Sequence, residues 1–300
     1  MGTKDNTPFF LLGSQRSGTT MLRLLLNKHP RLAVPHESKF IMAFFPRLAE
    51  YGDLADSKNA ARLLSDIAGH KAVVAGNLIV DKDVLLAKDI STFPRMIDAI
   101  MSEKAKQMGK ARWGDKTPYY ITHIDELWSL FPESKIIHLV RDGRDVVVSQ
   151  RNMEWMSDNL PRLAQDWSWK TTLCHKVGSV RGPDFFLEVK YEDLVLDTTG
   201  TLTSICDFLG EAFAPEMVDF SISNTDTVPA DSLKWHRHSV RAPELSKLAA
   251  WKHKLSVADR IIFEENAGSA LDLFGYRREN LPSTLGSRLK NLYYATIKRW

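Results

Sequence analysis

A short apolar run, a turn rich in small residues and a helical stretch follow one another near the start of this 300-residue chain. The run is Phe9-Phe10-Leu11-Leu12, and the turn extends from Gly13 to Ser17. This order predicts a buried strand, a tight turn and a helix over Thr19 to Lys28 that ends near His29-Pro30. A strand that feeds a helix in this way is typical of one unit of a parallel sheet.

Three further segments have the character of strands. Residues 135–140, "KIIHLV", are rich in β-branched side chains and follow the turn signal Phe131-Pro132. A third strand is expected within residues 185–195, and a short one over residues 31–34. Residues 40–110 are mostly helical in pattern. Alternation of strands and helices predicts an α/β fold, with a central parallel sheet flanked by helices in a single domain.

Composition limits the class of protein. The chain is 44% hydrophobic with a formal net charge of +3, which is too mild a charge for a nucleic-acid-binding surface. Its two cysteines, Cys174 and Cys206, do not make a disulfide framework, so a reducing compartment is expected. No stretch approaches the roughly 20 apolar residues that a transmembrane helix requires. We therefore expect a cytoplasmic localisation.

The first turn has an unusual relation to the nucleotide-binding P-loop, G-x-x-x-x-G-K-[ST]. Gly13 and Gly18 have its spacing, but Thr19 stands where the phosphate-binding lysine belongs. Backbone N–H groups at a helix N-terminus attract an anion, and side chains of the segment add donors. The added donors are those of Ser14, Arg16, Ser17, Thr19 and Thr20. The loop is predicted to hold one terminal phosphate-like group rather than a triphosphate with magnesium; the alternative is an ordinary capped turn.

A second polar turn, "RDGRDVVVS", follows the strand at residues 135–140. Gly143 permits a sharp turn, and a helix then carries Ser149 about two turns on. Arg141 and Ser149 could share one phosphate, with charge and hydroxyl from opposite sides. The alternative is a solvated charge cluster in which Asp142 and Asp145 favour the start of a helix. In parallel sheets ligands bind beyond the carboxyl ends of strands, so both turns belong to one predicted site.

With these residues in view, the chain resembles the sulfotransferases that use 3′-phosphoadenosine 5′-phosphosulfate (PAPS). The stretches that carry the resemblance are "QRSGTTMLRLLLNKHP", the glutamate of "PHES", "WGDKTPYY…LFPESKIIHLVRDGRDVVVS" and "VKYEDLVLD…ICDFLG". They are most similar to tyrosylprotein sulfotransferases and the bacterial sulfotransferases allied to them. The resemblance implies a single α/β domain with a P-loop-like PAPS site. It also implies sulfuryl transfer to a hydroxyl acceptor without a metal ion, with 3′,5′-adenosine bisphosphate as product.

The resemblance also implies roles for individual residues. The backbone of residues 17–20, which includes Ser17 and Gly18, would bind the 5′-phosphate together with the Thr19 and Thr20 hydroxyls. Arg141 and Ser149 would bind the 3′-phosphate. Two further residues, Tyr191 and Lys234, match family positions close to the cofactor.

Three residues match the family's catalytic positions. Glu37 would be the general base, and Arg16 and Lys116 would stabilise charge on the leaving group. Two of them have a plainer alternative: Glu37 as a surface acid, and Lys116 as an exposed lysine beside a helix-capping Asp115. His36 is a rival base. No metal site is predicted.

The acceptor and partners are less constrained. The absence of a predicted signal or anchor favours a hydroxylated sugar, lipid precursor or small metabolite over secreted protein tyrosines. "KFIMAFFPRL", residues 39–48, is either a packed helix or an acceptor-pocket wall. Rival functions are a P-loop kinase that uses ATP and a catalytically dead nucleotide-binding scaffold.

The last twenty residues form a segment of their own. We separate a domain over residues 1–280 from a basic amphipathic helix over residues 281–300. Its apolar face is Leu285, Leu289, Leu292, Tyr293 and Ile297. That face would pack on its own domain, on a second copy in a homodimer, or on an anionic membrane.

Overall fold

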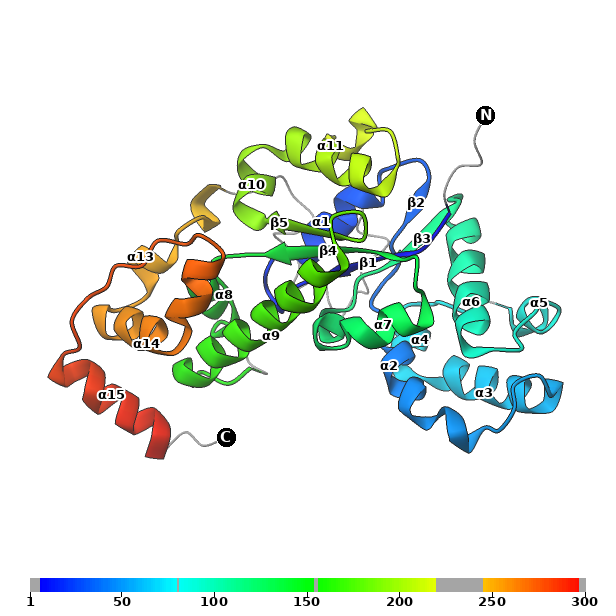
Figure 1. Cartoon of the computed structure of the whole chain (residues 1–300), viewed down its shortest axis with the longest axis horizontal. Coiled ribbons are helices and arrows are strands. Elements are labelled where there is room, and N and C mark those ends of the chain that lie inside the picture. The colour runs from blue at the N-terminus through cyan, green and yellow to red at the C-terminus, as the bar shows by residue number, and fades with distance from the viewer. Residues whose placement is uncertain (1–5, 80, 154–155, 220–244, 297–300) are drawn as a thin grey trace.

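Five parallel strands in the order β2-β3-β1-β4-β5 form the centre of the molecule (Figure 1). The strands are β1 (Phe9–Leu12), β2 (Leu32–Ala33), β3 (Arg112–Asp115), β4 (Lys135–Val140) and β5 (Phe186–Lys190). The structure is a computed structural model that describes residues 6–79, 81–153, 156–219 and 245–296. The prediction of a central parallel sheet is confirmed, and β1 and β4 have the predicted bounds. β2 and β5 lie within the predicted segments.

β3 is a strand that the sequence pattern does not predict. "RWGD" has four residues with a charge at each end and a glycine inside, so it shows neither alternation nor a β-branched run. It extends because it is held on both sides: Gly114 is paired with Phe9 of β1, and Arg112 with Leu32 of β2. A Cβ atom on Gly114 would meet the Phe9 ring at 2.4 Å, so only glycine fits between these strands.

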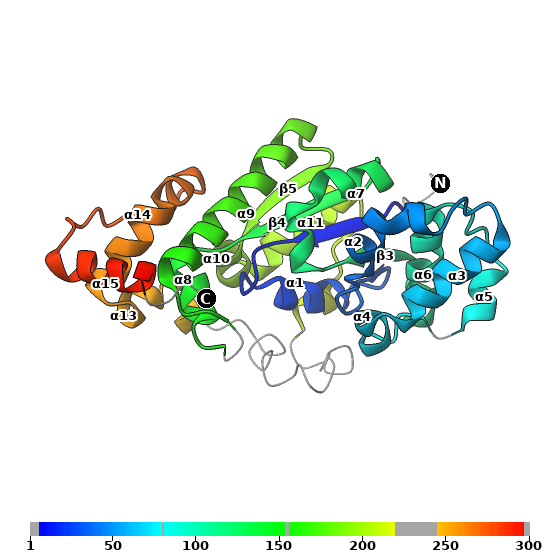
Figure 2. The same ribbon diagram turned by 90° about the horizontal axis from the view of Figure 1, so that it is seen from below.

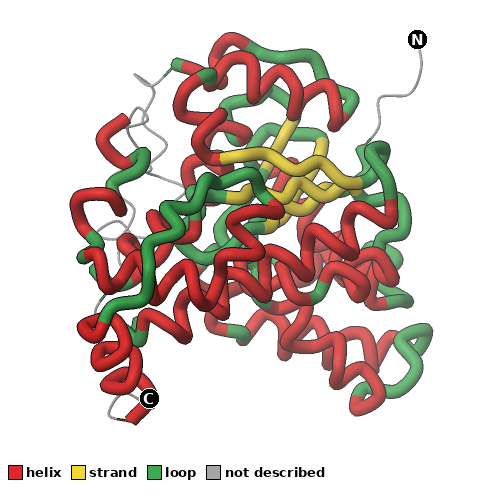
Figure 3. The backbone as a smooth tube through the Cα atoms, turned by 60° about the vertical axis from the view of Figure 1, so that its left-hand side comes forward, coloured by secondary structure: helices red, strands yellow, loops and turns green. Residues whose placement is uncertain are grey.

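The two faces of β1 enter different cores. Phe9 and Leu11 pack with one group of helices, above the sheet in Figure 1. These helices are α1 (Thr19–Leu26), α10 (Tyr191–Leu196), α11 (Thr198–Leu209) and the 3₁₀ turn η3 (Pro215–Val218). Phe10 and Leu12 pack on the opposite face. Figure 3 shows the strands enclosed between helices on both sides, as an all-parallel sheet requires.

The lower face is covered mainly by the segment that was predicted to be helical, residues 40–110. Its elements are α2 (Phe40–Phe44), η1 (Phe45–Glu50), α3 (Ser57–Gly69), α4 (Lys71–Ala75), α5 (Lys82–Leu86) and α6 (Phe93–Gln107). The turn η2 (Pro118–Thr122), α7 (Ile124–Leu130) and part of α9 (Leu160–Arg181), through Cys174, complete this face. Most apolar side chains of "KFIMAFFPRL", including Phe40, Ile41 and Phe44, are buried in the core, so the packed-helix interpretation is confirmed.

A third packed group lies beside β4, at the left of Figures 1 and 2. It consists of α8 (Gly143–Gln150), most of α9 (Leu160–Arg181), α13 (Trp251–Lys254), α14 (Val257–Leu273) and α15 (Leu285–Thr296), and the short turn η5 (Leu245–Lys247) precedes α13 in the chain. Gly143 is the first residue of α8. A larger residue does not fit there, because a Cβ atom would meet Trp167 at 2.4 Å and Phe263 at 2.7 Å. Close packing, rather than the sharp turn that was predicted, therefore explains this glycine.

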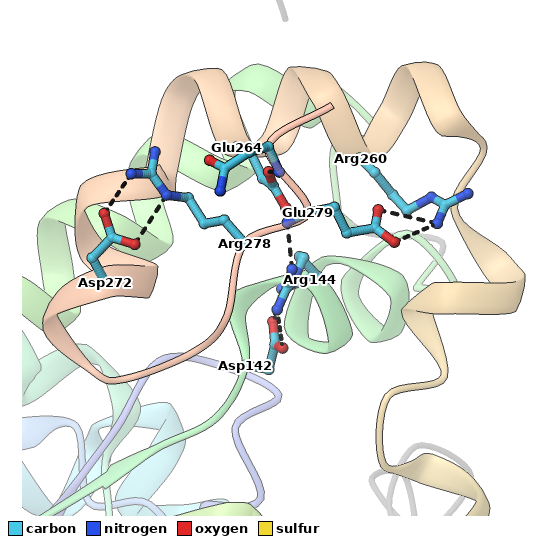
Figure 4. A network of polar contacts seen from close by, with 8 residues as sticks. Asp142, Arg144, Arg260, Glu264, Asp272, Arg278 and Glu279 are labelled. Atoms are coloured by element: carbon cyan, nitrogen blue, oxygen red, sulfur yellow. Dashed lines mark hydrogen bonds and ion pairs between the residues drawn. The ribbon is translucent and has the colours of Figure 1, made fainter. Parts of the chain in front are cut away.

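The charged residues around Gly143 are buried, so the alternative of a solvated cluster is wrong. Arg144 contacts Asp142 at 2.8 Å and Glu264 of α14 at 3.2 Å (Figure 4). Its guanidinium also lies 3.8 Å from the Trp251 ring centroid. Asp145 accepts a hydrogen bond of 2.9 Å from the Trp251 backbone N–H. The turn after β4 is thereby fixed to α13 and α14.

Helix α15 packs through Tyr294 and Ser287, which are buried. Lys290 forms an ion pair of 2.8 Å with Asp259 of α14. The described part of the predicted apolar face remains on the outside, with Leu285 and Leu289 74% and 59% exposed, whereas Ile297 lies outside the described residues. This face therefore does not pack on its own domain, while contact with a membrane or a second copy, and the division at residue 280, stay predictions. Within the described residues no helix is long and apolar enough to cross a membrane.

The packing of α9 on β5 gives a stability test. A Cβ atom on Gly178 would meet Phe186 ring carbons at 2.2 Å, whereas Gly69 at the end of α3 has nothing within 4 Å. We expect Gly178→Ala to lower the free energy of unfolding by about 1–3 kcal/mol because it overpacks the core. Gly69→Ala should be neutral or slightly stabilising. Urea unfolding of both variants checks this, and equal stability of the two would contradict the described packing.

Candidate functional site

The carboxyl ends of all five strands lie at one edge of the sheet, and each is followed by a polar residue or loop. In sheet order these are Glu37 after β2, Lys116 after β3, the loop at residues 13–18 after β1, Arg141 after β4 and Tyr191 after β5. Neighbouring strands lie about 4.8 Å apart, so the sequence-predicted residues spread along this edge in a row. The predicted site therefore has two ends, with the glycine-rich loop between them.

The loop has the conformation of an anion-binding turn. Arg16 and Gly18 have positive φ angles of 74° and 99°, and α1 begins at the next residue. A Cβ atom on Gly18 would meet the Tyr191 ring at 2.3 Å, so a side chain is excluded there. The hydroxyls of Ser14 and Ser17 are buried and have no hydrogen-bond partner among the described residues. Buried donors without partners are costly, and an anion in the loop would satisfy them.

Four predicted residues gather at the β4–β5 end of the loop. Arg16 Nε donates a hydrogen bond of 3.1 Å to Ser149 Oγ. Arg141 Nη1 donates to the Arg16 carbonyl at 3.3 Å, and its guanidinium lies 4.3 Å from the Tyr191 ring centroid. Burial, together with the charge of Arg141, lowers the pKa of Arg16. Two neighbouring guanidinium groups, one of them hydrogen-bonded to a hydroxyl, favour binding of a phosphate.

Glu37 and Lys116 meet at the β2–β3 end. Glu37 Oε1 lies 2.7 Å from Lys116 Nζ, and Glu37 Oε2 lies 3.1 Å from Lys39 Nζ. Lys116 Nζ also donates to Thr20 Oγ1 at 3.4 Å, which links this pair to the start of α1. Lys116 is 3% exposed, so the alternative of a solvent-exposed lysine is wrong. Asp115 ends β3 and does not cap a helix.

The charges around Glu37 set its pKa. Burial alone would raise the pKa of Glu37, but Lys116 and Lys39 outweigh it and lower the value to about 2. Burial lowers the pKa of Lys116, and Glu37 opposes that change. Burial also lowers the pKa of His36 to about 4, which keeps this rival base neutral at pH 7. Glu37 is therefore a carboxylate held between two ammonium groups.

The structure separates the three predicted catalytic residues. Glu37 and Lys116 are in contact, whereas Arg16 lies on Ser149 and Arg141 at the other end of the loop. The predicted role of Arg16 at the leaving group stays a prediction. Lys234 lies outside the described residues.

Some residues of the site were not predicted. Asn27 exchanges two hydrogen bonds of 2.7 Å with the backbone of Val34, which fixes the segment between β2 and Glu37. Arg23 is buried in α1 and donates to the Val34 carbonyl at 3.2 Å; burial lowers its pKa to about 10. Lys39 adjoins the predicted base in sequence, and that adjacency was the available signal. Within the described ranges no group of three or more metal-ligating side chains occurs.

The chain belongs to the sulfotransferase family, whose model matches residues 8–215. It is 25% identical over 217 residues to protein-tyrosine sulfotransferase 2 of Gallus gallus, covering 69% of this chain and 52% of that protein. It is 28% identical over 174 residues to sulfotransferase 2A1 of Mus musculus, covering 47% and 60% respectively. Nodulation protein NoeE of Sinorhizobium fredii is 32% identical over 143 residues, covering 48% of this chain and 30% of that protein.

Two solved structures share the fold. The sulfotransferase domain of the Synechococcus PCC 7002 olefin synthase superposes with a TM-score of 0.61 at 24% identity, covering 94% of this chain and 98% of that one. The sulfotransferase domain from the curacin biosynthetic pathway gives 0.59 at 20% identity, covering 92% and 100%. The predicted family and fold class are thereby confirmed.

Arg141 offers a test of the β4–β5 end. Removing a charge-assisted contact should weaken binding of 3′,5′-adenosine bisphosphate to Arg141→Ala roughly 10- to 100-fold. Binding of adenosine 5′-phosphate, which lacks the 3′-phosphate, should change less. Arg162→Ala on α9, at an exposed arginine, is the control. Isothermal titration of the wild type and both variants measures the affinity for each nucleotide. Equal losses of affinity for both nucleotides in Arg141→Ala would contradict the assignment of Arg141 to the 3′-phosphate.

Proposed function

We propose that the chain transfers a sulfuryl group from PAPS to a hydroxyl acceptor. The observation that carries the proposal is the division of the site: a guanidinium–hydroxyl cluster at one end of the loop and a carboxylate–ammonium pair at the other. PAPS has a 3′-phosphate and a separate 5′-phosphosulfate, and so presents two anionic groups to two such ends. The family membership of the chain supports this assignment.

The residues present fit the nucleotide. Arg141 and Ser149 would hold the 3′-phosphate, and Arg141 Nε is buried without a hydrogen-bond partner in the described part of the chain. The backbone of residues 17–20, with the Thr19 and Thr20 hydroxyls, would hold the 5′-phosphate at the N-terminus of α1. Lys116, in contact with Thr20, would then lie beside the phosphosulfate.

Glu37 takes the role of general base. Sulfuryl transfer forms a bond between the acceptor oxygen and the sulfur and breaks the bond from that sulfur to the bridging oxygen, whose electron pair leaves with the 5′-phosphate. Glu37 accepts the proton of the acceptor hydroxyl, and Lys116 balances the charge that grows on the bridging oxygen. No metal ion takes part in this scheme.

The low pKa of Glu37 requires an explanation, because a carboxylate with a pKa of about 2 is a weak base. Lys116 contacts Glu37 directly, and a neighbouring phosphosulfate would compete for the same ammonium group. When Lys116 turns toward that anion, Glu37 loses its stronger partner and its pKa rises. Glu37 would thus gain basicity only when the sulfuryl donor is in place.

The acceptor is proposed as a hydroxylated sugar, lipid precursor or small metabolite that approaches Glu37 from the side of Lys39, whose side chain is half exposed. A cytoplasmic location is proposed with it. Nucleic acid is not among the proposed partners. The kinase alternative is disfavoured because Thr19 stands in place of the P-loop lysine.

Transfer to a hydroxylated metabolite extract tests the activity and identifies the acceptor. With PAPS and no magnesium, mass spectrometry should show an acceptor whose mass increases by one sulfuryl group. Glu37→Gln should then lower turnover at least about 100-fold while binding of the bisphosphate is kept. The loss should be smaller for a phenol than for an alcohol, because a phenol ionises more readily.

His36→Ala is the matched control, because His36 adjoins Glu37 and is neutral. A larger loss in His36→Ala than in Glu37→Gln would move the base by one residue. Full activity of Glu37→Gln would contradict base catalysis by this carboxylate, and a wild-type chain that transfers nothing to any acceptor would contradict the proposed function.

A further inference from the structure

A set of buried polar side chains lies directly behind the Glu37–Lys116 pair, and the scheme above does not use it. Each member is at most 1% exposed, and together they form one network: Ser38, Asp115, Thr117 and Tyr120. Their places in the chain are informative. Ser38 follows Glu37, and Asp115 and Thr117 stand on either side of Lys116.

Asp115 is the acceptor at the centre of this network. Its Oδ1 accepts a hydrogen bond of 2.7 Å from Thr117 Oγ1, and its Oδ2 accepts one from Ser38 Oγ. Thr117 Oγ1 in turn accepts the Ser38 backbone N–H at 3.1 Å. Two of these hydrogen bonds join Ser38, the residue next to Glu37, to the two neighbours of Lys116, and the third joins those neighbours to each other.

Tyr120 extends the network to the next helix. Its hydroxyl lies 3.0 Å from Ser38 Oγ and accepts the Ile41 backbone N–H at 3.1 Å, near the start of α2. The hydrogens can be assigned consistently: Tyr120 donates to Ser38, and Ser38 and Thr117 both donate to Asp115. An ionised carboxylate, which only accepts, fits the end of such a chain.

Burying the Asp115 carboxylate in this network costs free energy. Burial raises the pKa of Asp115 to about 6, although the Ser38 and Thr117 hydroxyls favour the ionised form. A buried carboxylate contributes little net stability even when it is hydrogen-bonded, but a fully connected polar network specifies one geometry. The segments it joins are two separate loops, and the hydrogen bond between Ser38 and Asp115 spans 77 residues of sequence.

We propose that Asp115, with Ser38, Thr117 and Tyr120, forms a clamp of positioning residues that fixes Glu37 and Lys116 at their working separation. The inference rests on the proposed function, because it assigns the clamp to the catalytic pair. Asp115 lies behind that pair and positions it through the backbones of Ser38 and Lys116.

Asp115→Asn changes the clamp with little change of shape. Two hydroxyls donate to Asp115, but an amide offers only one oxygen acceptor and presents N–H donors in place of the other. One of the two hydroxyl hydrogens therefore loses its buried acceptor, which weakens the link between the two segments. A small misplacement of reacting groups can lower turnover about 100-fold, so we expect a 10- to 100-fold fall in kcat.

Nucleotide affinity distinguishes a specific loss of kcat in Asp115→Asn from a general loss of folded structure. The affinity for 3′,5′-adenosine bisphosphate should stay within about threefold of wild type, because the 3′-phosphate contacts lie at the other end of the loop. Asp98→Asn is the matched control: Asp98 accepts a 2.8 Å hydrogen bond from Trp113 on the same strand, away from the pair. The Asp98→Asn variant should have the kcat of the wild type.

A double-mutant cycle gives the decisive readout. If Asp115 acts by positioning Glu37, then Asp115→Asn should cost little further turnover once Glu37→Gln is present. Full additivity of the two losses, or wild-type kcat in Asp115→Asn, would overturn the clamp. If Asp115→Asn does not fold, Tyr120→Phe, which removes one hydroxyl from the same network, takes its place in the cycle. A wild-type chain without sulfuryl transfer would instead contradict the proposed function.

Discussion

The parallel direction of the five strands is the constraint on which the rest of the structure depends. Because every strand runs the same way, every loop that follows a strand emerges at the same edge of the sheet. Glu37, Lys116 and Arg141, which are far apart in sequence, become members of one row for this reason alone. The strand order then decides which neighbours meet, and it places β2 and β3 together and so brings Glu37 to Lys116.

The same constraint distributes charge along the edge. At one end lie the guanidinium groups of Arg16 and Arg141 and the Ser149 hydroxyl. At the other end the Glu37 carboxylate is held between Lys116 and Lys39. The loop between them carries buried serine hydroxyls without protein partners among the described residues. The sheet order therefore provides cations at two separate positions, as the proposed binding of two anions requires, while Thr19 stands in place of the P-loop lysine.

Part of this arrangement could be predicted from the sequence. The segments 9–12 and 135–140 are wholly or mostly apolar, and their strands were predicted with the right bounds because such runs are buried on both faces. β3 was not predicted, because its four residues lack a strand pattern and are extended only through pairing with the adjacent strands β1 and β2. Lys116, which follows it, was therefore identified by family resemblance and not by pattern.

Tertiary contacts explain what the sequence could not show. Ser38 and Asp115 are ordinary polar residues in sequence, and only the pairing of β2 with β3 reveals that they meet. Arg144 and Asp145 were compatible with a solvated helix start, yet they are buried against Trp251. The contact of Arg16 with Ser149, rather than with Lys116, likewise depends on a side-chain direction that no sequence pattern encodes.

Thermal unfolding without magnesium tests most directly whether this edge binds two separate phosphates. At one hundred times its dissociation constant, 3′,5′-adenosine bisphosphate should raise Tm by about 5 °C, whereas ATP with or without magnesium should raise it much less. Stabilisation by ATP with magnesium, and none by the bisphosphate, would contradict the account and favour a kinase.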